Sequence, residues 1–175
     1  MMKKTLFVAL VLNLFCAGAQ GFDYIPYQGI FKEMHSDHFT ILFTDRFRER
    51  AVQTLRYSED IHLKIKEYLK WAPEERVILI LTDDTDLPNG LSTVMPRSTV
   101  ILNMVSLDRI DSLRDADDPL YSLILHELAH IYHLDQVSGA ALFWRVLYGR
   151  LYFPNQGSFS WMHEGVAVNA ESDLA

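Results

Sequence analysis

Two histidines and a glutamate stand in one five-residue segment, His126-Glu127-Leu128-Ala129-His130, which has the pattern H-E-x-x-H. Residues four apart lie on one face of an α-helix, so His126 and His130 could bind one Zn²⁺ together. Glu127 would project beside the metal, where its carboxylate could accept a proton from a bound water. The segment therefore predicts a zinc site with a general base, which is suited to hydrolysis.

The residues around this segment must form a helix for the two histidines to converge. Asp118 at an N-cap followed by Pro119 at the first helical position is a strong helix start, and residues 120–134 contain neither Gly nor Pro. Apolar residues cover most of the helix circumference, which indicates a buried helix. Buried histidines need polar partners, since an unpaired buried polar group is costly. A metal ion would serve, and backbone carbonyls or water are the alternative.

A catalytic zinc site has three protein ligands and one open position, so a third ligand is expected elsewhere in the chain. Residues 161–171, WMHEGVAVNAE, could form a helix capped by Ser160, with Glu164 and Glu171 on the same face. One carboxylate could bind the metal. The other could accept the second N–H of a ligating histidine and fix its ring. The alternative is that both glutamates are ordinary solvated residues.

Together, the H-E-x-x-H segment and the pattern W-x-x-E-G-x-A-x-x-x-E resemble the gluzincin group of zinc metallopeptidases. The chain is similar in particular to the peptidase MA-like domains of bacterial secreted proteins. This resemblance implies three zinc ligands: His126, His130 and Glu164. It also implies Glu127 as the general base and Glu171 as the carboxylate that orients a ligating histidine. The implied fold is a zincin-like α+β fold in which the active-site helix carries the H-E-x-x-H segment.

The resemblance also implies how a substrate would bind. In zincins the edge strand near the metal pairs with an extended peptide or protein substrate, and here this strand would lie at about residues 90–95. Backbone pairing has little sequence preference, so cleavage specificity is not predicted. The chain lacks the G-x-M-E-N segment of gluzincin aminopeptidases, which argues against exopeptidase activity.

Two further histidines adjoin the motifs. His133 lies seven residues after His126, but three ligands on one straight helix cannot easily converge on a tetrahedral centre, so we expect His133 at the helix end, paired with Asp135. His163 adjoins Glu164 and is the candidate for stabilising the oxyanion of amide hydrolysis. Weaker candidates for that role are three tyrosines, Tyr132, Tyr148 and Tyr152. The other histidines, His35, His38 and His62, belong to no evident cluster.

The function that these residues predict is that of a secreted zinc-dependent peptidase. A metal-activated water would attack the peptide carbonyl, and Glu127 would take its proton and deliver it to the leaving amine. Two alternatives remain. The first is a non-catalytic zinc-bound module for binding or assembly within a larger secreted protein, although such a module has no need of Glu127. The second is a zinc hydrolase that acts on small esters or amides.

Residues 1–19 predict a secretory signal peptide, with two lysines, an apolar run and an A-x-A cleavage site at Ala17-Gly18-Ala19. The apolar run is too short for a membrane span, so we expect the mature chain to be secreted or periplasmic. Cys16 is the only cysteine, and it lies within this leader. The mature chain would therefore have neither a disulfide nor a cysteine zinc ligand.

The chain is acidic, with 16 Lys and Arg against 23 Asp and Glu and a net charge of −7. Its charge argues against nucleic-acid binding and against anionic membrane surfaces. Residues 20–175 have the size of one domain. We expect a zincin-like metallopeptidase domain truncated at its C-terminal end. By resemblance, the full-length protein could continue into a Tol-type β-propeller.

Hydrophobic spacing predicts an α+β order in which helices pack on a twisted mixed sheet. The expected strands are residues 39–43, 77–81, 91–95 and 99–104. The expected helices are residues 45–71, 120–134, 140–148 and the segment containing Glu164. The apolar stripe of residues 45–71 is interpreted as core packing, and residues 154–157 as a loop.

Overall fold

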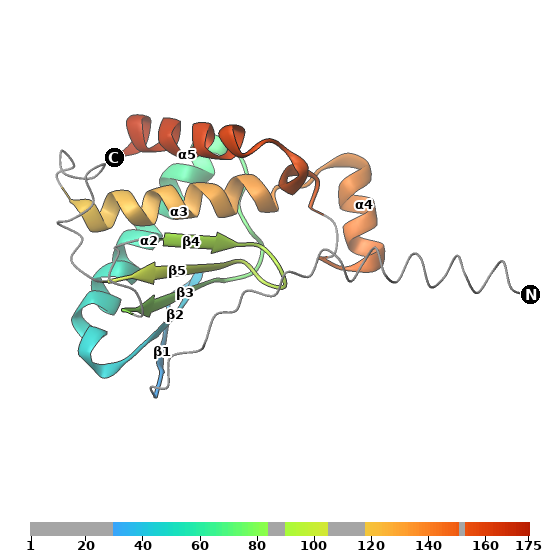
Figure 1. Ribbon diagram of the computed structural model, residues 1–175. Helices are drawn as coiled ribbons and strands as arrows, with labels where there is room; N and C mark the ends of the chain where they lie inside the picture. The colour runs from blue at the N-terminus through green and yellow to red at the C-terminus, as the bar shows by residue number, and fades with distance from the viewer. Residues whose placement is uncertain (1–29, 84–89, 105–117, 151–152) are drawn as a thin grey trace, which may run out of the picture.

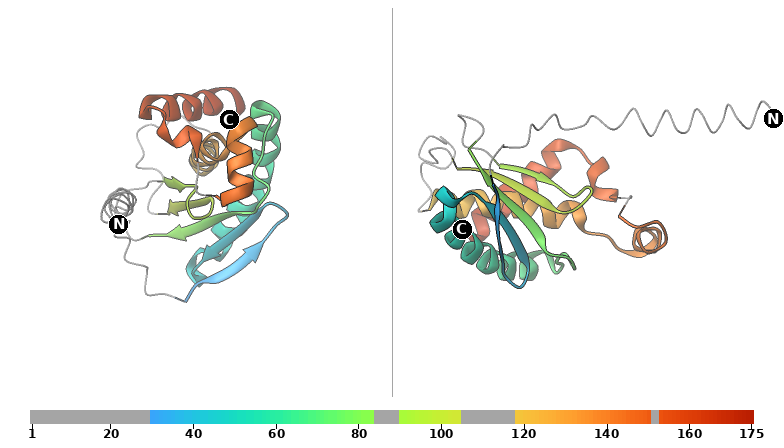
Figure 2. Two further views of the ribbon diagram at one scale, coloured as in Figure 1. Left: turned by 90° about the vertical axis from the view of Figure 1, so that its right-hand side faces the viewer. Right: turned by 90° about the horizontal axis from the view of Figure 1, so that it is seen from below.

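The computed structural model describes residues 30–83, 90–104, 118–150 and 153–175. The predicted signal peptide, Cys16 and Tyr152 lie outside these residues. Within the described part of the chain, a five-stranded mixed sheet carries helices on one side, so the fold is α+β (Figures 1 and 2).

The strands of the sheet are β1 (Lys32–His35), β2 (Phe39–Phe43), β3 (Val77–Thr82), β4 (Gly90–Thr93) and β5 (Thr99–Asn103). Their order across the sheet is β1-β2-β3-β5-β4. The three central strands are parallel, whereas β1 and β4 are antiparallel to their neighbours and form the two edges. The expected edge strand at residues 90–95 is therefore confirmed as β4, which ends two residues earlier.

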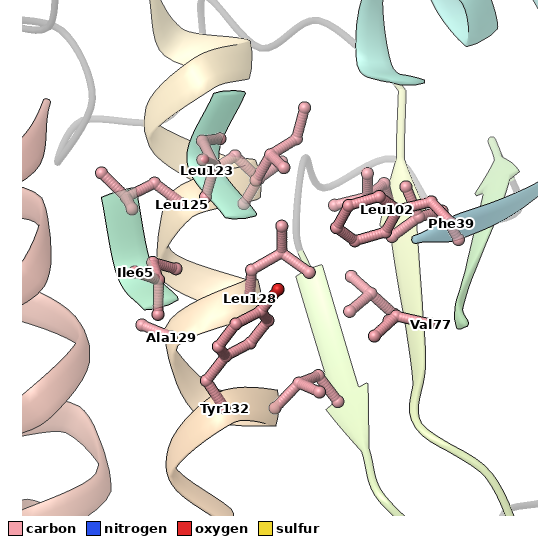
Figure 3. Close-up of a cluster of buried hydrophobic side chains, with 14 of the residues drawn as sticks. Phe39, Ile65, Val77, Leu102, Leu123, Leu125, Leu128, Ala129 and Tyr132 are labelled. Atoms are coloured by element: carbon pink, nitrogen blue, oxygen red, sulfur yellow. The ribbon is translucent and has the colours of Figure 1, made fainter. Parts of the chain in front are cut away.

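Side chains of the central strands alternate between a buried and a partly exposed face. In β2 and β3 the register pairs Phe39 with Val77 and Ile41 with Leu79, and all four are buried. Because alternate residues of a strand point to opposite faces, this register places one apolar row against the helices. Figure 3 shows Leu128 and Tyr132 pointing from a helix toward Val77 and Leu102 of the sheet.

The expected helix at residues 45–71 forms as the 3₁₀ turn η1 (Asp45–Phe47) followed by α2 (Arg48–Leu69). The helix ends at Lys70, which adopts a left-handed conformation with φ of 52°. Its inner face is confirmed as core by buried Ala51, Ile61 and Ile65. The same face also buries Thr54, Ser58 and His62, which apolar spacing alone did not indicate.

Helix α3 (Pro119–Asp135) carries the H-E-x-x-H segment through the middle of the fold (Figure 1). Its start is confirmed: Asp118 Oδ1 accepts hydrogen bonds from Leu120 N at 3.1 Å and Tyr121 N at 3.2 Å. Pro119 stands at the first helical position, where its missing N–H leaves no donor unpaired. One face of α3 packs on the sheet, and α5 (Ser160–Leu174) packs on another face of α3 (Figure 2).

Helix α4 (Gly139–Tyr148) follows α3 and lies apart from the sheet (Figure 1). The turn η4 (Pro154–Gly157), expected as a loop, leads from there to α5. The expected cap of α5 is wrong. Ser160 is the first helical residue, and the N-cap position is Phe159, which offers no side-chain acceptor. Because the chain enters from η4, Ser158 turns back instead and donates to Asn155 O at 2.6 Å.

Candidate metal centre

Helix α3 presents His126 and His130 side by side, one turn apart. Their Nε2 atoms lie 3.1 Å from each other, and both rings are partly buried. Glu127 projects next to them and is 6% exposed. This arrangement follows directly from the helical spacing, since residues i and i+4 share one face.

Helix α5 brings a carboxylate to the two histidines from a segment more than thirty residues later in the chain. Glu164 Oε2 lies 3.5 Å from His126 Nε2, and Glu164 Oε1 lies 3.7 Å from His130 Nε2. One ligand atom from each of the three residues lies within 4.8 Å of the others. His126, His130 and Glu164 therefore form a group that could hold a metal ion.

The spacing of these three residues fits zinc. Tetrahedral Zn²⁺ with bonds of about 2.0–2.1 Å requires its ligand atoms to be separated by about 3.3 Å. The two imidazole nitrogens are 3.1 Å apart, and each lies 3.5 or 3.7 Å from one of the two Glu164 oxygens, so all three distances are near that value. Two imidazole nitrogens and one carboxylate also form the donor set of a catalytic rather than a purely structural zinc site. The residues present therefore fit zinc in both distance and chemistry.

Glu171 lies two turns beyond Glu164 on α5 and reaches the other nitrogen of a ligand. Its Oε2 lies 3.1 Å from His126 Nδ1. A carboxylate there holds the proton on Nδ1 and leaves the Nε2 lone pair directed at the metal position. The hydrogen bond to Glu171 raises the pKa of His126 above its ordinary value, against the opposing effect of burial. The expected pairing of Glu171 with a ligating histidine thus has the required geometry.

The pKa of His130 is shifted in the opposite direction to the pKa of His126. Burial, together with the nearby His126 ring, lowers the pKa of His130 to about 4. His130 is consequently neutral near pH 7, which is the form that binds a metal.

Glu127 is held against strand β4. Ser92 Oγ donates to the Glu127 carboxylate and lies 3.0 Å from the Glu127 backbone oxygen. Gly90 lies so near that a Cβ atom there would overlap the same carboxylate. Burial raises the pKa of Glu127, and the Ser92 hydrogen bond partly opposes that increase. The strand at residues 90–95 was expected near the metal, but the contacts of Gly90 and Ser92 with Glu127 were not, because no local pattern links these residues to α3.

These residues line an open cleft of about 510 Å³. Strand β4, helix α3 and the start of α5 each contribute residues to its lining. The lining includes His126, Glu127, His130, His163 and Glu164, so the cleft collects the residues that the two motifs supplied. Leu91 and Leu134 add apolar surface beside them.

His163 lines the cleft, and its ring contacts Ser158. Its Nε2 lies 3.1 Å from Ser158 Oγ and 3.2 Å from Ser158 O. The expected pairing of His133 with Asp135 is wrong. Asp135 instead lies 2.9 Å from Arg145 Nη2 and 3.1 Å from Arg150 Nη2, because α4 folds back on this end of α3.

The described tyrosines stand away from the cleft. Tyr132 is fully buried on another face of α3, and its hydroxyl lies 2.5 Å from His62 Nδ1. Tyr148 is 62% exposed on α4. Neither tyrosine lines the cleft, so both are unsuited to stabilise an oxyanion there.

A second polar cluster links histidines that showed no relation in the sequence. The rings of His38 and His62 stack with centroids 3.7 Å apart, and His38 Nδ1 lies 2.8 Å from Glu59 Oε2. Burial lowers the pKa of His62, as does the neighbouring His38. This cluster lies on the core side of α3 and belongs to the packing of the domain.

Comparison with known proteins adds no further support: no family model and no curated protein matches the chain. What the structure supports is a group of two histidines and one glutamate that could hold a metal ion, with His126 and His130 at the spacing of an H-E-x-x-H segment. Among the described residues, no helix is long and apolar enough to span a membrane.

Proposed function

We propose that the protein is a secreted zinc-dependent peptidase of the gluzincin type, with His126, His130 and Glu164 as metal ligands. The observation that carries this proposal is the convergence of these three residues within 4.8 Å, beside a buried glutamate in the same cleft. The three ligands alone would also suit a structural metal. The adjacent Glu127 supplies the base that hydrolysis requires.

Bound zinc would supply Lewis acidity toward water and toward the scissile carbonyl group. Glu127 would accept the proton of the attacking water as the oxygen bonds to the carbonyl carbon. It would then deliver that proton to the amide nitrogen as the C–N bond breaks. Its raised pKa suits both steps, because a carboxyl group with a pKa nearer neutrality both accepts and returns a proton readily.

Strand β4 supports a peptide as the substrate. It is an edge strand, and its residues Leu91 and Ser92 line the cleft. An extended peptide could add to this edge by backbone hydrogen bonds, which would place its carbonyl group above the ligands. His163 also lines the cleft, and its expected role as an oxyanion donor would require its Nε2–H to turn from Ser158 to the substrate. Export would follow from the signal peptide expected at residues 1–19.

The test combines metal content with cleavage of an unfolded protein substrate, using the chain carrying Glu127→Gln and the chain carrying Glu164→Ala. We expect about one zinc in the wild type and in Glu127→Gln, with hydrolysis lost by about a hundredfold or more in that variant. Glu164→Ala should lose both zinc and activity. Unchanged hydrolysis in zinc-loaded Glu127→Gln would overturn the assignment of the base. A zinc-loaded wild type that cleaves no peptide would refute the proposal that the protein is a peptidase.

A further inference from the structure

Two histidines near the candidate metal centre have rings that lie close together, and each ring has one nitrogen atom without a partner. His133 is in the last turn of α3 and His163 is in the first turns of α5. Their ring centroids are 5.6 Å apart. His133 Nε2 and His163 Nδ1 are both shielded from solvent, and neither has a hydrogen-bond partner among the described residues. An unpaired buried polar atom is costly, so each calls for a partner.

The protonation of His163 follows from its contacts with Ser158. The Ser158 hydroxyl uses its proton on Asn155 O at 2.6 Å, so Ser158 Oγ can only accept from the imidazole. Ser158 O, at 3.2 Å, is also an acceptor. Nε2 of His163 must therefore carry the proton. In the tautomer with its proton on Nε2, an imidazole has its lone pair at Nδ1.

His133 is held in place from the same turn. Asn155 Nδ2 donates to His133 O at 2.7 Å and to Gln136 O at 3.3 Å, which fastens η4 to the end of α3. Burial lowers the pKa of His133, and its neighbour His163 adds to the effect. The backbone of His133 and the ring of His163 are thus both held by contacts with the same turn.

We propose that His133 and His163 bind a second transition-metal ion, separate from the centre formed by His126, His130 and Glu164. Two imidazoles that share a tetrahedral metal, with nitrogen–metal bonds of about 2.1 Å, have ring centres about 5 Å apart. The observed 5.6 Å is close to that separation, and the His126–His130 pair has 4.7 Å. Imidazole donors select Zn²⁺, Ni²⁺ or Cu²⁺ over Mg²⁺ or Ca²⁺. With two protein ligands, this site would be the weaker of the two.

The proposal goes beyond the peptidase, and its test does not use activity. Purified full-length chain would be dialysed against increasing Zn²⁺, and bound metal per chain would be measured by atomic spectroscopy. We expect the wild type to bind about one ion tightly and a second one at higher concentration. His133→Gln and His163→Gln should each abolish the second equivalent and retain the first, with circular dichroism verifying the fold.

Two controls separate this site from the others. Glu164→Gln should weaken the tight site and leave the second equivalent in place. His35→Asn should leave both bound equivalents unchanged. This control is needed because the exposed His35 lies 3.3 Å from Glu33, and the two side chains could attract a metal ion on their own. A wild type that saturates at one equivalent would overturn the proposal. A second equivalent that survives both His133→Gln and His163→Gln would do the same.

Discussion

The Ser92 hydroxyl group lies between two parts of Glu127, donating to its carboxylate and lying 3.0 Å from its backbone oxygen. It therefore joins the edge strand of the sheet to the residue that we propose as the base. A strand that binds substrate and also holds the base keeps the two in a fixed relation.

Replacing Ser92 with alanine should lower kcat and leave zinc content unchanged. Loss of one hydrogen bond to a charged group should reduce kcat by about tenfold. The measurement is steady-state peptide cleavage with metal analysis of the same sample. Thr93→Ala is the matched control, because the Thr93 hydroxyl is bonded to Met95 instead. Equal losses in the two variants would show that Ser92 acts only through the stability of the strand.

Removing the Glu171 carboxylate should weaken zinc binding. Because Glu171 lies 3.1 Å from His126 Nδ1, Glu171→Ala would free that ring to rotate and change its tautomer. We expect the zinc dissociation constant to rise by about 10–100-fold, measured by competition with a chelator. Asp173→Asn is the control, since it removes one negative charge from the same helix at a side chain bonded to Asn169. An equal effect of both variants would indicate net charge instead of ring orientation.

Substituting the buried Asp135 should destabilise the fold. Asp135 is 1% exposed and lies about 3 Å from the guanidinium groups of Arg145 and Arg150. Asp135→Asn would remove the anion that these two largely buried cations share, with a loss of about 3 kcal/mol in the free energy of unfolding. Urea denaturation of the variant and the wild type measures this loss. Asp45→Asn, at an exposed ion pair with Lys32, should change little. A similar loss in both variants would argue against a special role of Asp135.

Stability should fall as the pH drops below about 6.5, in part because of His62. Its pKa in the folded state is lowered by burial and by His38, so below the unfolded value the unfolded chain binds more protons. Above about pH 6.5, where His62 is neutral in both states, its protonation does not reduce the free energy of unfolding. As the pH falls from there toward the lowered pKa of the folded state, the free energy of unfolding decreases. Denaturation of the metal-free protein at several pH values should give a smaller acid-side decline for His62→Asn than for the wild type. His35→Asn serves as the exposed control, and an unchanged decline in His62→Asn would contradict the prediction.

The parts of the site that the sequence revealed are the local ones. Helical spacing pairs His126 with His130, and the Asp118-Pro119 start is visible without any tertiary information. Glu164 was found through a second motif with its own recognisable pattern. Gly90 and Ser92 could not be found in that way, because their contact with Glu127 depends on the order of strands across the sheet.

The features that the sequence did not predict correctly all depend on tertiary packing or on the path of the backbone, which leave no local pattern. Strand β1 is a polar edge strand, and KEMH has no buried row to produce an alternating signal. The stacking of His38 and His62 joins a loop to the inner face of α2, and neither residue has a neighbour in sequence that hints at the other. Ser160 looked like a cap because its residue type suits one, yet backbone entry from η4 decides which residue occupies that position.

Helix α5 buries only two small side chains, Ala167 and Ala170, with the partly buried Leu174 also packed against the core. Its polar contacts with α3 include those of Glu164 and Glu171. A bound ion would therefore act as a clip that closes the chain between His130 and Glu164, a segment that includes α4 and η4. A metal ion that closes a loop lowers the conformational entropy of the unfolded chain, and this effect grows with the length of the loop. Chelation would accordingly release the C-terminal helix first, and amide hydrogens there would exchange with solvent sooner than those of α2 or the central strands.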